Sequence, residues 1–324
     1  MSGMINPFEY SLDNKRYHTW NWHLREKFGE KVFKVSLNAG FTCPNIDGSK
    51  GVGGCIYCSS SGSGDFAGNP EKNILEQFAD VREQMHKKWQ KAKYIAYFQA
   101  HTNTYAPVFV LREKFEPVLT LPDVVGLSVA TRADALADDV VDYLEELSKR
   151  TYLIVELGLQ TVHDRTALLI NRCHTYAEFL QGYKKLSERG INICPHLIFG
   201  LPGETHSDML ESAKEVASLN PHAVKFHLLH ILKNTPLAKM YERGDLKALT
   251  REEYVDIIVD ALEVMPKETV IERLTGDGAP DSLIAPLWSL KKFCVLNEID
   301  KEMVRRNSYQ GIKSRNAAET SLFS

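Results

Sequence analysis

The sequence predicts an α/β protein: a partial (β/α)6 barrel of parallel strands, similar to a TIM barrel, with a helical and basic C-terminal extension. Two observations carry this prediction. Short runs rich in β-branched and aromatic residues alternate with amphipathic runs, which is the pattern of parallel βαβ units. Polar and glycine-rich residues come directly after the strand candidates, where barrels and open parallel sheets carry their sites. A full barrel or a doubly wound sheet would give the same alternation.

The strand candidates follow one another along the whole chain. They are Val32–Leu37, Tyr94–Phe98, Val124–Ala130, Tyr152–Leu157, Asn192–Ile198 and Ala223–Leu229, with a seventh at Thr269–Leu274. Amphipathic stretches between them predict helices because their apolar residues recur at helical spacing. These stretches are Leu75–Gln90, Asp138–Lys149, Tyr176–Arg189, Ser207–Ser218 and Arg251–Val264.

The order of these elements predicts four segments. Residues 1–31 form an N-terminal extension rich in aromatic and basic side chains, which we expect to pack on the barrel. Residues 32–265 form the partial barrel, and residues 266–316 form the C-terminal extension. Residues 317–324 are expected to be a disordered tail.

The composition excludes several classes of protein. The chain has 324 residues, 44% of them hydrophobic and 25% charged, as is usual for a globular protein. No apolar run approaches the roughly 20 residues that span a bilayer, so we expect no membrane partner. The first residues lack the features of a signal peptide, which favours a cytoplasmic location. The formal net charge of -3 gives no global attraction to nucleic acid, although it can conceal a local basic patch.

Three cysteines after the first strand form the strongest motif. Cys43, Cys55 and Cys58 offer three thiolates, one short of a closed zinc site or a fully ligated iron–sulfur cubane. A cubane held by three cysteines keeps one iron open to a substrate or cosubstrate. The glycines before Cys55 allow the backbone to fold around a cluster, and Tyr57 can shield one side. The alternative is a zinc site with a fourth ligand elsewhere, for example His101.

Further motifs follow the other strands, so their side chains should meet at one end of the barrel. Gln99-Ala-His101-Thr-Asn103 follows the second strand, and Ala130-Thr-Arg132-Ala-Asp134 lies at the end of the third. Glu156-Leu-Gly158-Leu-Gln160-Thr ends the fourth, and Asn171-Arg172-Cys173-His174-Thr comes after it. The fifth ends in His196-Leu-Ile198-Phe-Gly200-Leu-Pro202-Gly203-Glu204.

Taken in this order, the motifs resemble those of the radical S-adenosylmethionine (SAM) superfamily over roughly residues 10–310. The long gap of eleven residues between the first two cysteines resembles the YtqA- and YhcC-like proteins and, more distantly, the catalytic subunit of Elongator. The resemblance implies that Cys43, Cys55 and Cys58 ligate a [4Fe–4S] cluster whose free iron binds SAM. The cluster would pass one electron to SAM, which would split into methionine and a 5′-deoxyadenosyl radical that abstracts a hydrogen atom.

The same resemblance implies roles for residues that contact SAM. Arg172 matches an arginine that holds the SAM carboxylate, and Gln160 would reach the ribose. Ile198 and Gly200 would lie against the adenine. Four further candidates for the SAM site are Gln99, Asn103, Arg132 and Glu156. Cys173 stands where the pattern has glycine and receives no role.

The resemblance further implies a substrate and partners. The Elongator likeness suggests tRNA, with conversion of a carboxymethylaminomethyl group on the wobble uridine to the aminomethyl form. An electron donor such as flavodoxin or ferredoxin would reduce the cluster. Two basic stretches with an aromatic residue, 86–93 and 305–315, are compatible with RNA binding, and each is also compatible with a solvated surface.

Two other functions remain open from the sequence. One is a radical SAM enzyme that acts on a small molecule, such as a porphyrin-pathway substrate. The other is a zinc-stabilised RNA-binding protein without catalysis. Candidate substrate contacts are His227, His230, Arg273 and Asp277.

Overall fold

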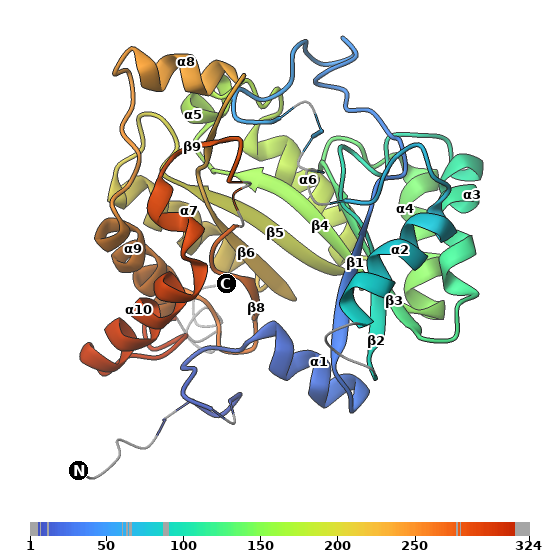
Figure 1. Ribbon diagram of the computed structural model, residues 1–324, viewed down its shortest axis with the longest axis horizontal. Coiled ribbons are helices and arrows are strands. Elements are labelled where there is room, and N and C mark those ends of the chain that lie inside the picture. Colours follow the sequence, from blue (N-terminus) through green and yellow to red (C-terminus); the bar gives the residue numbers. More distant parts are fainter. Residues whose placement is uncertain are drawn as a thin grey trace, which may run out of the picture.

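Seven parallel strands form one curled sheet in the computed structural model, which describes residues 6, 8–11, 13–59, 61–62, 64, 67–86, 91–276, 278 and 280–314 (Figure 1). The strands are β1 (Val32–Leu37), β2 (Lys93–Phe98), β3 (Val124–Thr131), β4 (Tyr152–Gln160), β5 (Asn192–Phe199), β6 (Ala223–Leu228) and β8 (Val270–Arg273). A short antiparallel pair, β7 (Ile231–Leu232) and β9 (Leu283–Ala285), lies apart from this sheet.

The strand order confirms the predicted partial barrel. It runs β1-β2-β3-β4-β5-β6-β8 without a reversal, and every neighbouring pair is parallel. A doubly wound sheet reverses its strand order at a switch point, so that alternative is wrong. The sheet includes β8, which lies beyond our predicted boundary at residue 265; the four predicted segments otherwise remain a prediction.

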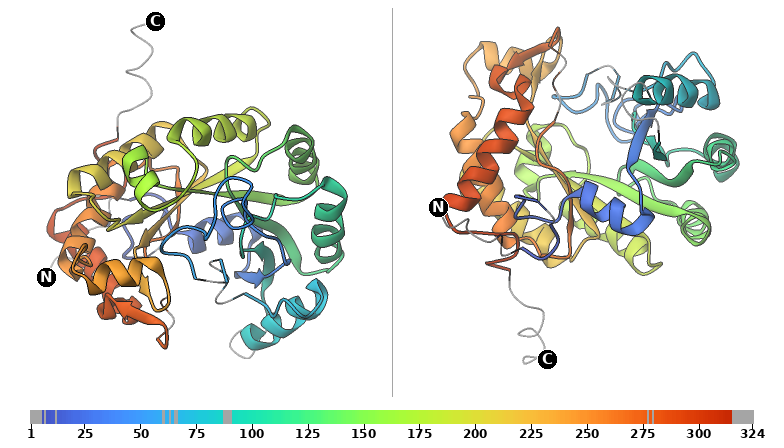
Figure 2. Two further views of the ribbon diagram at one scale, coloured as in Figure 1. Left: turned by 90° about the horizontal axis from the view of Figure 1, so that it is seen from above. Right: turned by 60° about the horizontal axis from the view of Figure 1, so that its bottom comes forward.

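Helices cover the outer face of the curled sheet, as the two further views show (Figure 2). The structure has α1 (Trp20–Phe28), α2 (Ile74–His86), α3 (Val108–Leu119), α4 (Asp138–Arg150), α5 (Asp164–Leu169), α6 (Tyr176–Ser187), α7 (His206–Ser218), α8 (Pro236–Glu242), α9 (Arg251–Val264), a 3-10 turn η1 (Leu287–Leu290) and α10 (Lys292–Arg305). Their apolar faces and the outward side chains of the strands form the main core. The five helices expected from the sequence are present, and α1, α3, α5 and α8 were not predicted. Helix α10 lies in the C-terminal extension that was predicted to be helical, although its bounds were not.

Local sequence signals fix where three of these helices begin. Thr175, Thr205 and Thr250 each accept a hydrogen bond from the backbone three residues later, and the acidic residue there bonds back to the threonine backbone. This reciprocal capping box satisfies donors that a helix start otherwise leaves open. Helices α6, α7 and α9 therefore start where the sequence pattern places them.

The N-terminal segment closes the lower end of the half-barrel, where the strands begin (Figure 1). Thr19 forms a parallel bridge with Ile271 of β8, and the amide of Ile271 donates to the His18 carbonyl. Helix α1 lies beneath the strands and packs Leu24 against Val32 and Ile95. The loop after β1 and helices α5 and α8 lie at the opposite end, where the strands finish (Figure 1).

Candidate active site

A cavity of about 290 Å³ lies at the C-terminal end of the strands. Nine of the eleven residues predicted for the site line it, and they come from six separate segments of the chain. They are Cys43, Cys55, Cys58, Gln99, Arg132, Glu156, Gln160, Arg172 and Ile198. The structure therefore brings these nine residues together at one cavity, and their roles at that cavity remain a prediction.

The two other predicted residues, Asn103 and Gly200, are not among the described residues that line the cavity. The buried Asn103 amide donates to the carbonyls of Phe98, Ala100 and Ala130, bracing the ends of β2 and β3. The backbone of Gly200, at a φ of +93°, faces Leu249 and Leu229. A SAM contact at either position remains a prediction that these contacts do not support.

The cysteine loop folds onto the segment that follows α5. The amide of Asn45 donates to Cys55 Sγ at 3.6 Å and also to the carbonyl of Asn171. The Asn171 side chain in turn donates to the carbonyls of Val52 and Gly54, 3.1 and 2.8 Å away. These bonds tie the loop that carries the cysteines to the motif that carries Arg172.

The thiol of Cys55 is held in an environment that favours its ionised form. A hydrogen bond with Cys58 lowers its pKa, and contacts with Tyr57, Arg132 and Asn45 add to this effect against the cost of burial, so that the pKa is about 6. A cysteine ligates metal as the thiolate. Cys55 can therefore bind iron at neutral pH without first losing a proton to solvent.

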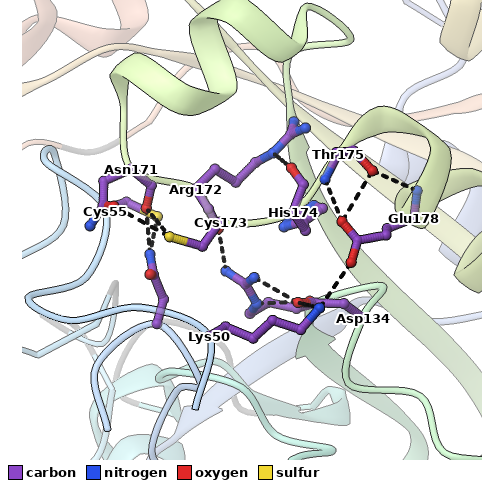
Figure 3. A network of polar contacts seen from close by, with 11 residues as sticks. Lys50, Cys55, Asp134, Asn171, Arg172, Cys173, His174, Thr175 and Glu178 are labelled. Carbon is purple, nitrogen blue, oxygen red and sulfur yellow. Dashed lines mark hydrogen bonds and ion pairs between the residues drawn. The ribbon is translucent and has the colours of Figure 1, made fainter. Parts of the chain in front are cut away.

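Polar contacts connect Lys50 of this loop with Asp134 and Glu178, as the close view shows (Figure 3). Arg132 forms a two-pronged ion pair with Asp134, with contacts of 2.9 and 2.8 Å, and its Nη1 donates to the carbonyl of Arg172 at 2.9 Å. Lys50 of the cysteine loop approaches Asp134 and pairs with Glu178 at 2.9 Å. The loops after β1, β3 and β4 are thus joined by one polar network.

Arg172 is almost fully buried and uses most of its donors within the protein. Its Nε donates to the carbonyl of His174, and its Nη1 donates to the carbonyls of Leu159 and Thr161. Its Nη2 has no hydrogen-bond partner among the described residues and lies 3.7 Å from Asp164. An arginine usually grips a carboxylate with two nitrogens, whereas here Nη2 alone is left for a ligand.

Glu156 is at the centre of a buried ionic network inside the barrel. Lys34 lies 2.6 Å from its carboxylate, Tyr97 donates to it at 2.8 Å, and Lys225 and Ser128 also contact it. Burial alone would raise the pKa of Glu156, but Lys225 and Lys34 hold it well below the usual range. Glu272 pairs with the same two lysines.

This network changes the interpretation of Glu156. Its carboxylate lines the cavity but already has two cationic partners and two hydroxyl donors. A direct bond to SAM therefore remains a prediction, with little acceptor capacity to support it. The sequence offered only weak signals for the partners: Lys34 and Lys225 interrupt apolar strands, where an unpaired charge would be costly.

His174 lines the cavity, and sequence reasoning gave it no role. It is 5% exposed, and neither ring nitrogen has a partner among the described residues. Burial, together with Arg172 and Arg132, lowers its pKa to about 3, so the ring is neutral at physiological pH. A neutral imidazole has one donor and one acceptor, and neither makes a hydrogen bond with a described residue here.

The candidate substrate contacts lie on the β6 and β8 side of the cavity. His227, His230 and Arg273 line it, and the rings of His227 and His196 are 5.1 Å apart. Asp277 lies outside the described residues. Of the other cysteines, Cys173 sits beside Gly51 of the cysteine loop, Cys194 is buried and Cys294 is exposed.

The predicted basic stretches receive little support. Residues 87–90 and 315 lie outside the described residues. In the second stretch, Arg306 pairs with Asp256, Asp260 and Glu302, Arg305 pairs with Glu302, and Lys313 pairs with Glu263. These carboxylates offset the positive charge that was expected to attract RNA. Separately, no helix in the described part of the chain is long and apolar enough to cross a membrane.

The sequence matches two protein-family models and several known proteins. Residues 49–216 match the model of the Radical SAM superfamily, and residues 221–305 match that of the Radical_SAM C-terminal domain. The chain is 58% identical over 306 residues to the protein YtqA of Bacillus subtilis, covering 94% of this chain and 95% of that one.

Two more distant similarities involve proteins named for tRNA or Elongator. The chain is 28% identical over 156 residues to a tRNA uridine(34) acetyltransferase of Methanocaldococcus jannaschii, covering 47% of this chain and 28% of that protein. Its fold is similar to that of Elp3 from Methanocaldococcus infernus, with a TM-score of 0.66 at 18% identity, covering 87% of this chain and 64% of that one.

Proposed function

The chain belongs to the radical SAM superfamily, and on that basis we propose that it uses a [4Fe–4S] cluster on Cys43, Cys55 and Cys58 to cleave SAM and modify the wobble uridine of tRNA. The single observation that carries the proposal is that three thiols line one cavity together with an arginine whose Nη2 has no hydrogen-bond partner in the part of the chain that the structure describes. A cluster and SAM, when bound, supply a radical able to remove hydrogen from an unactivated C–H bond.

The residues at the cavity fit these cofactors. Cys55 favours its thiolate form, and Cys58 follows it on the same turn, with a bond of 3.0 Å from its amide to the Cys55 carbonyl. Arg172 Nη2 and both nitrogens of His174 are buried polar atoms that make no hydrogen bond with any described residue. Buried donors and acceptors are rarely left unpaired, so a polar ligand such as the amino-acid end of SAM is expected beside them.

The protein's own part is to bind and orient the ligands and to exclude water. Arg172 is immobilised by three backbone carbonyls, which fixes the direction of its remaining nitrogen. Ile198 offers an apolar surface in the same cavity, suited to a flat base. Gln160, at a φ of +65°, is held in the left-handed region at the end of β4 with its side chain over Gly158, from where it can reach a sugar hydroxyl.

The spacing of the thiols favours a cluster over a single zinc ion. Zinc binds sulfur at about 2.3 Å, so thiolates that share one tetrahedral ion lie about 3.8 Å apart. Among the described residues, one set of three possible metal-ligand atoms lies within 4.8 Å of one another. It belongs to His163, Asp208 and Glu211, and the three cysteines do not form such a set. Thiolates on separate irons of a cubane can be further apart.

Three considerations support tRNA as the substrate. About half of this chain is similar to part of an enzyme named for uridine 34 of tRNA. The described lining of the cavity includes four cationic and five imidazole side chains, which are potential hydrogen-bond donors to an anionic substrate. The reaction we propose, from carboxymethylaminomethyl to aminomethyl uridine, begins at a C–H bond beside a carboxylate. A flavodoxin or ferredoxin would supply the electron.

Mass spectrometry of tRNA nucleosides tests this substrate directly. A strain lacking the protein should accumulate the carboxymethylaminomethyl form and lose the aminomethyl form, and the wild-type gene should reverse both changes. A gene carrying Cys55→Ala should not, whereas one carrying Cys294→Ala, which changes an exposed thiol outside the cavity, should. Identical wobble nucleosides in the deletion and parent strains would exclude the tRNA reaction and favour a small-molecule substrate.

A further inference from the structure

Asn45 places a hydrogen-bond donor against one of the three cysteines proposed to hold the cluster. Its side-chain nitrogen donates to Cys55 Sγ at 3.6 Å and to the backbone carbonyl of Asn171. A carbonyl oxygen can only accept, so the amide atom that faces it must be the nitrogen. The same nitrogen lies against Cys55, and the sulfur of Cys55 is therefore the acceptor.

The position of Asn45 is fixed by groups other than the cysteine. The residue is 0% exposed, and its own backbone carbonyl accepts from the amide of Gly54 at 2.8 Å. Gly51 leaves room for the side chain, because a Cβ atom at that position would lie 2.3 Å from Asn45 Oδ1. The bonds to Asn171 and Gly54 involve no sulfur, so the donor should keep its place when the cysteines bind iron.

Tyr57 gives the same sulfur a second donor. Its side chain forms a hydrogen bond with that of Cys55, and the phenolic O–H is the donor to a thiolate. Tyr57 also packs against a small apolar core at this end of the barrel. Both donors therefore reach Cys55 from within the protein, where hydrogen bonds are electrostatically stronger than in water.

Hydrogen bonds to the ligand sulfurs affect how readily an iron–sulfur cluster accepts an electron. The reduced cluster carries one more negative charge than the oxidised cluster, and part of that charge resides on the sulfurs. A donor directed at a sulfur stabilises the reduced form more than the oxidised form, so it raises the reduction potential. Removal of such a donor should therefore make the potential more negative.

We propose that Asn45 and Tyr57 raise the reduction potential of the cluster through their hydrogen bonds to Cys55. This inference rests on the cluster of the proposed function and does not depend on the substrate. Both are positioning residues, because they act on the cluster through the cysteine and are not expected to ligate iron. Their effect is to allow a weaker electron donor to reduce the cluster, which is the step that must precede cleavage of SAM.

A redox titration of the cluster tests the proposal. Anaerobically reconstituted protein, without SAM, is poised at a series of potentials, and the reduced cluster is measured by electron paramagnetic resonance. Tyr57→Phe removes a single hydroxyl, and Asn45→Ala removes the amide. Each variant should have a more negative midpoint than the wild type. In the double variant, the ratio of reduced to oxidised cluster at the wild-type midpoint should fall about tenfold, which is about 59 mV for one electron.

Asn171→Gly is the matched control. The Asn171 side chain also holds the cysteine loop, but it does so by donating to the carbonyls of Val52 and Gly54. Glycine suits the backbone there, at a φ of +54°, and keeps the carbonyl that Asn45 contacts. The potential of this variant should match the wild type. An equal fall in Asn171→Gly would show that loop packing sets the potential, and would overturn the proposal.

Iron content and absorbance confirm that each variant is loaded, and Tyr57→Phe provides the test if Asn45→Ala does not take up iron. A hydrogen bond to Sγ weakens the Fe–S bond, so the Fe–Sγ stretch in resonance Raman spectra should move to higher frequency in both variants and stay in place in Asn171→Gly. A more negative potential without that change would contradict a role for the hydrogen bonds.

Two further outcomes separate this inference from the proposed function. Wild-type protein that forms no iron–sulfur cluster would overturn both together. A wild-type cluster whose potential is the same in iron-loaded Tyr57→Phe and Asn45→Ala would overturn this inference alone.

Discussion

Arg132 donates from Nη1 to the backbone carbonyl of Arg172, 2.9 Å away, so one cavity arginine positions the other. The same guanidinium is held by both oxygens of Asp134. Motifs that end the third strand and follow the fourth are thereby locked together directly beside the cysteine loop. This contact brings two motifs that are far apart in the sequence to the wall of one cavity.

Removal of Arg172 should weaken SAM binding. Arg172→Ala deletes the one guanidinium nitrogen left for a carboxylate, and a hydrogen bond to a charged group contributes about 1.5–3 kcal/mol. We expect SAM affinity to fall by roughly 10- to 150-fold in equilibrium binding to cluster-loaded protein. The cluster itself should remain, as absorbance and iron content would show.

Arg172 also satisfies three carbonyls, so its loss should lower stability as well. Arg172→Lys is the matched control, because it keeps the charge but loses the fixed fork geometry. It should retain more SAM affinity than Arg172→Ala. Unchanged SAM affinity in a folded, iron-loaded Arg172→Ala protein would refute the assignment.

Breaking the buried ionic network should destabilise the fold. In Lys225→Met, Glu156 and Glu272 keep Lys34 as their one lysine partner among the described residues. Removing one partner of a buried ion pair costs about 3–5 kcal/mol of stability. The free energy of unfolding in urea should fall by this amount. Glu302→Gln, which breaks surface pairs with Arg305 and Arg306, should cost about 1 kcal/mol or less. Equal losses for the two variants would show that the network contributes no more than a surface pair.

Stability should fall in mild acid because of three histidines at the lower end of the barrel. Burial and cationic neighbours lower the pKa of His23 to about 3, burial lowers that of His222 to about 4, and burial lowers that of His18. In the unfolded chain these histidines take up protons near pH 6.5, whereas in the folded chain they do so only at lower pH. Their contribution to the free energy of unfolding is therefore complete above pH 6.5 and is lost as the pH falls toward 4. Each group contributes up to about 1.4 kcal/mol per pH unit in this window.

The free energy of unfolding, measured from pH 7.5 to 4.5, checks this expectation. His222→Gln should make the decline shallower, because this ring, 2.7 Å from the Tyr152 hydroxyl, no longer titrates. His206→Gln is the control, since that histidine is exposed. An identical slope in His222→Gln and the wild type would rule out His222 as a source of the effect.

The three remaining cysteines should be dispensable for the cluster. Cys194 packs in a small core beside Ile154 and Ala223, and Cys294 is exposed on α10. Cys173 lies next to the cysteine loop, but its thiol donates to Asn171 Oδ1 at 3.3 Å. A variant with all three changed to serine should keep about four irons per chain. A fall below that number would show that at least one of the three is needed for the cluster, and single serine variants would identify which.

The fold and the cysteine motif could be predicted because their signals are local. The apolar run Val32–Leu37 is β1 to the residue, and the CxxC spacing lies within one turn. Helix α3 was missed because Pro117 lies inside it and its start at Pro107 has no side-chain cap. Helix α10 likewise begins without a side-chain cap.

The rest of the site depends on contacts that the sequence does not reveal. The partners of Glu156 include residues of β1, β2, β3 and β6, so nothing in the sequence spacing links them. They are Lys34, Tyr97, Ser128 and Lys225. A β-bulge at Glu272 breaks strict alternation, which would have pointed Arg273 away from the cavity. Asn103 differs from the prediction in another way. Its position in the motif suggested a ligand contact, but its side-chain amide donates to three backbone carbonyls.

Anaerobic incubation with SAM and a reductant tests the central claim most directly. Reconstituted wild-type protein should convert SAM to 5′-deoxyadenosine and methionine, detected by liquid chromatography and mass spectrometry. Cys43→Ala, Cys55→Ala and Cys58→Ala should each abolish the product together with the bound iron, whereas Cys294→Ala should retain both. Wild-type protein that carries stoichiometric zinc without iron, or that forms no 5′-deoxyadenosine with a full iron complement, would contradict the account.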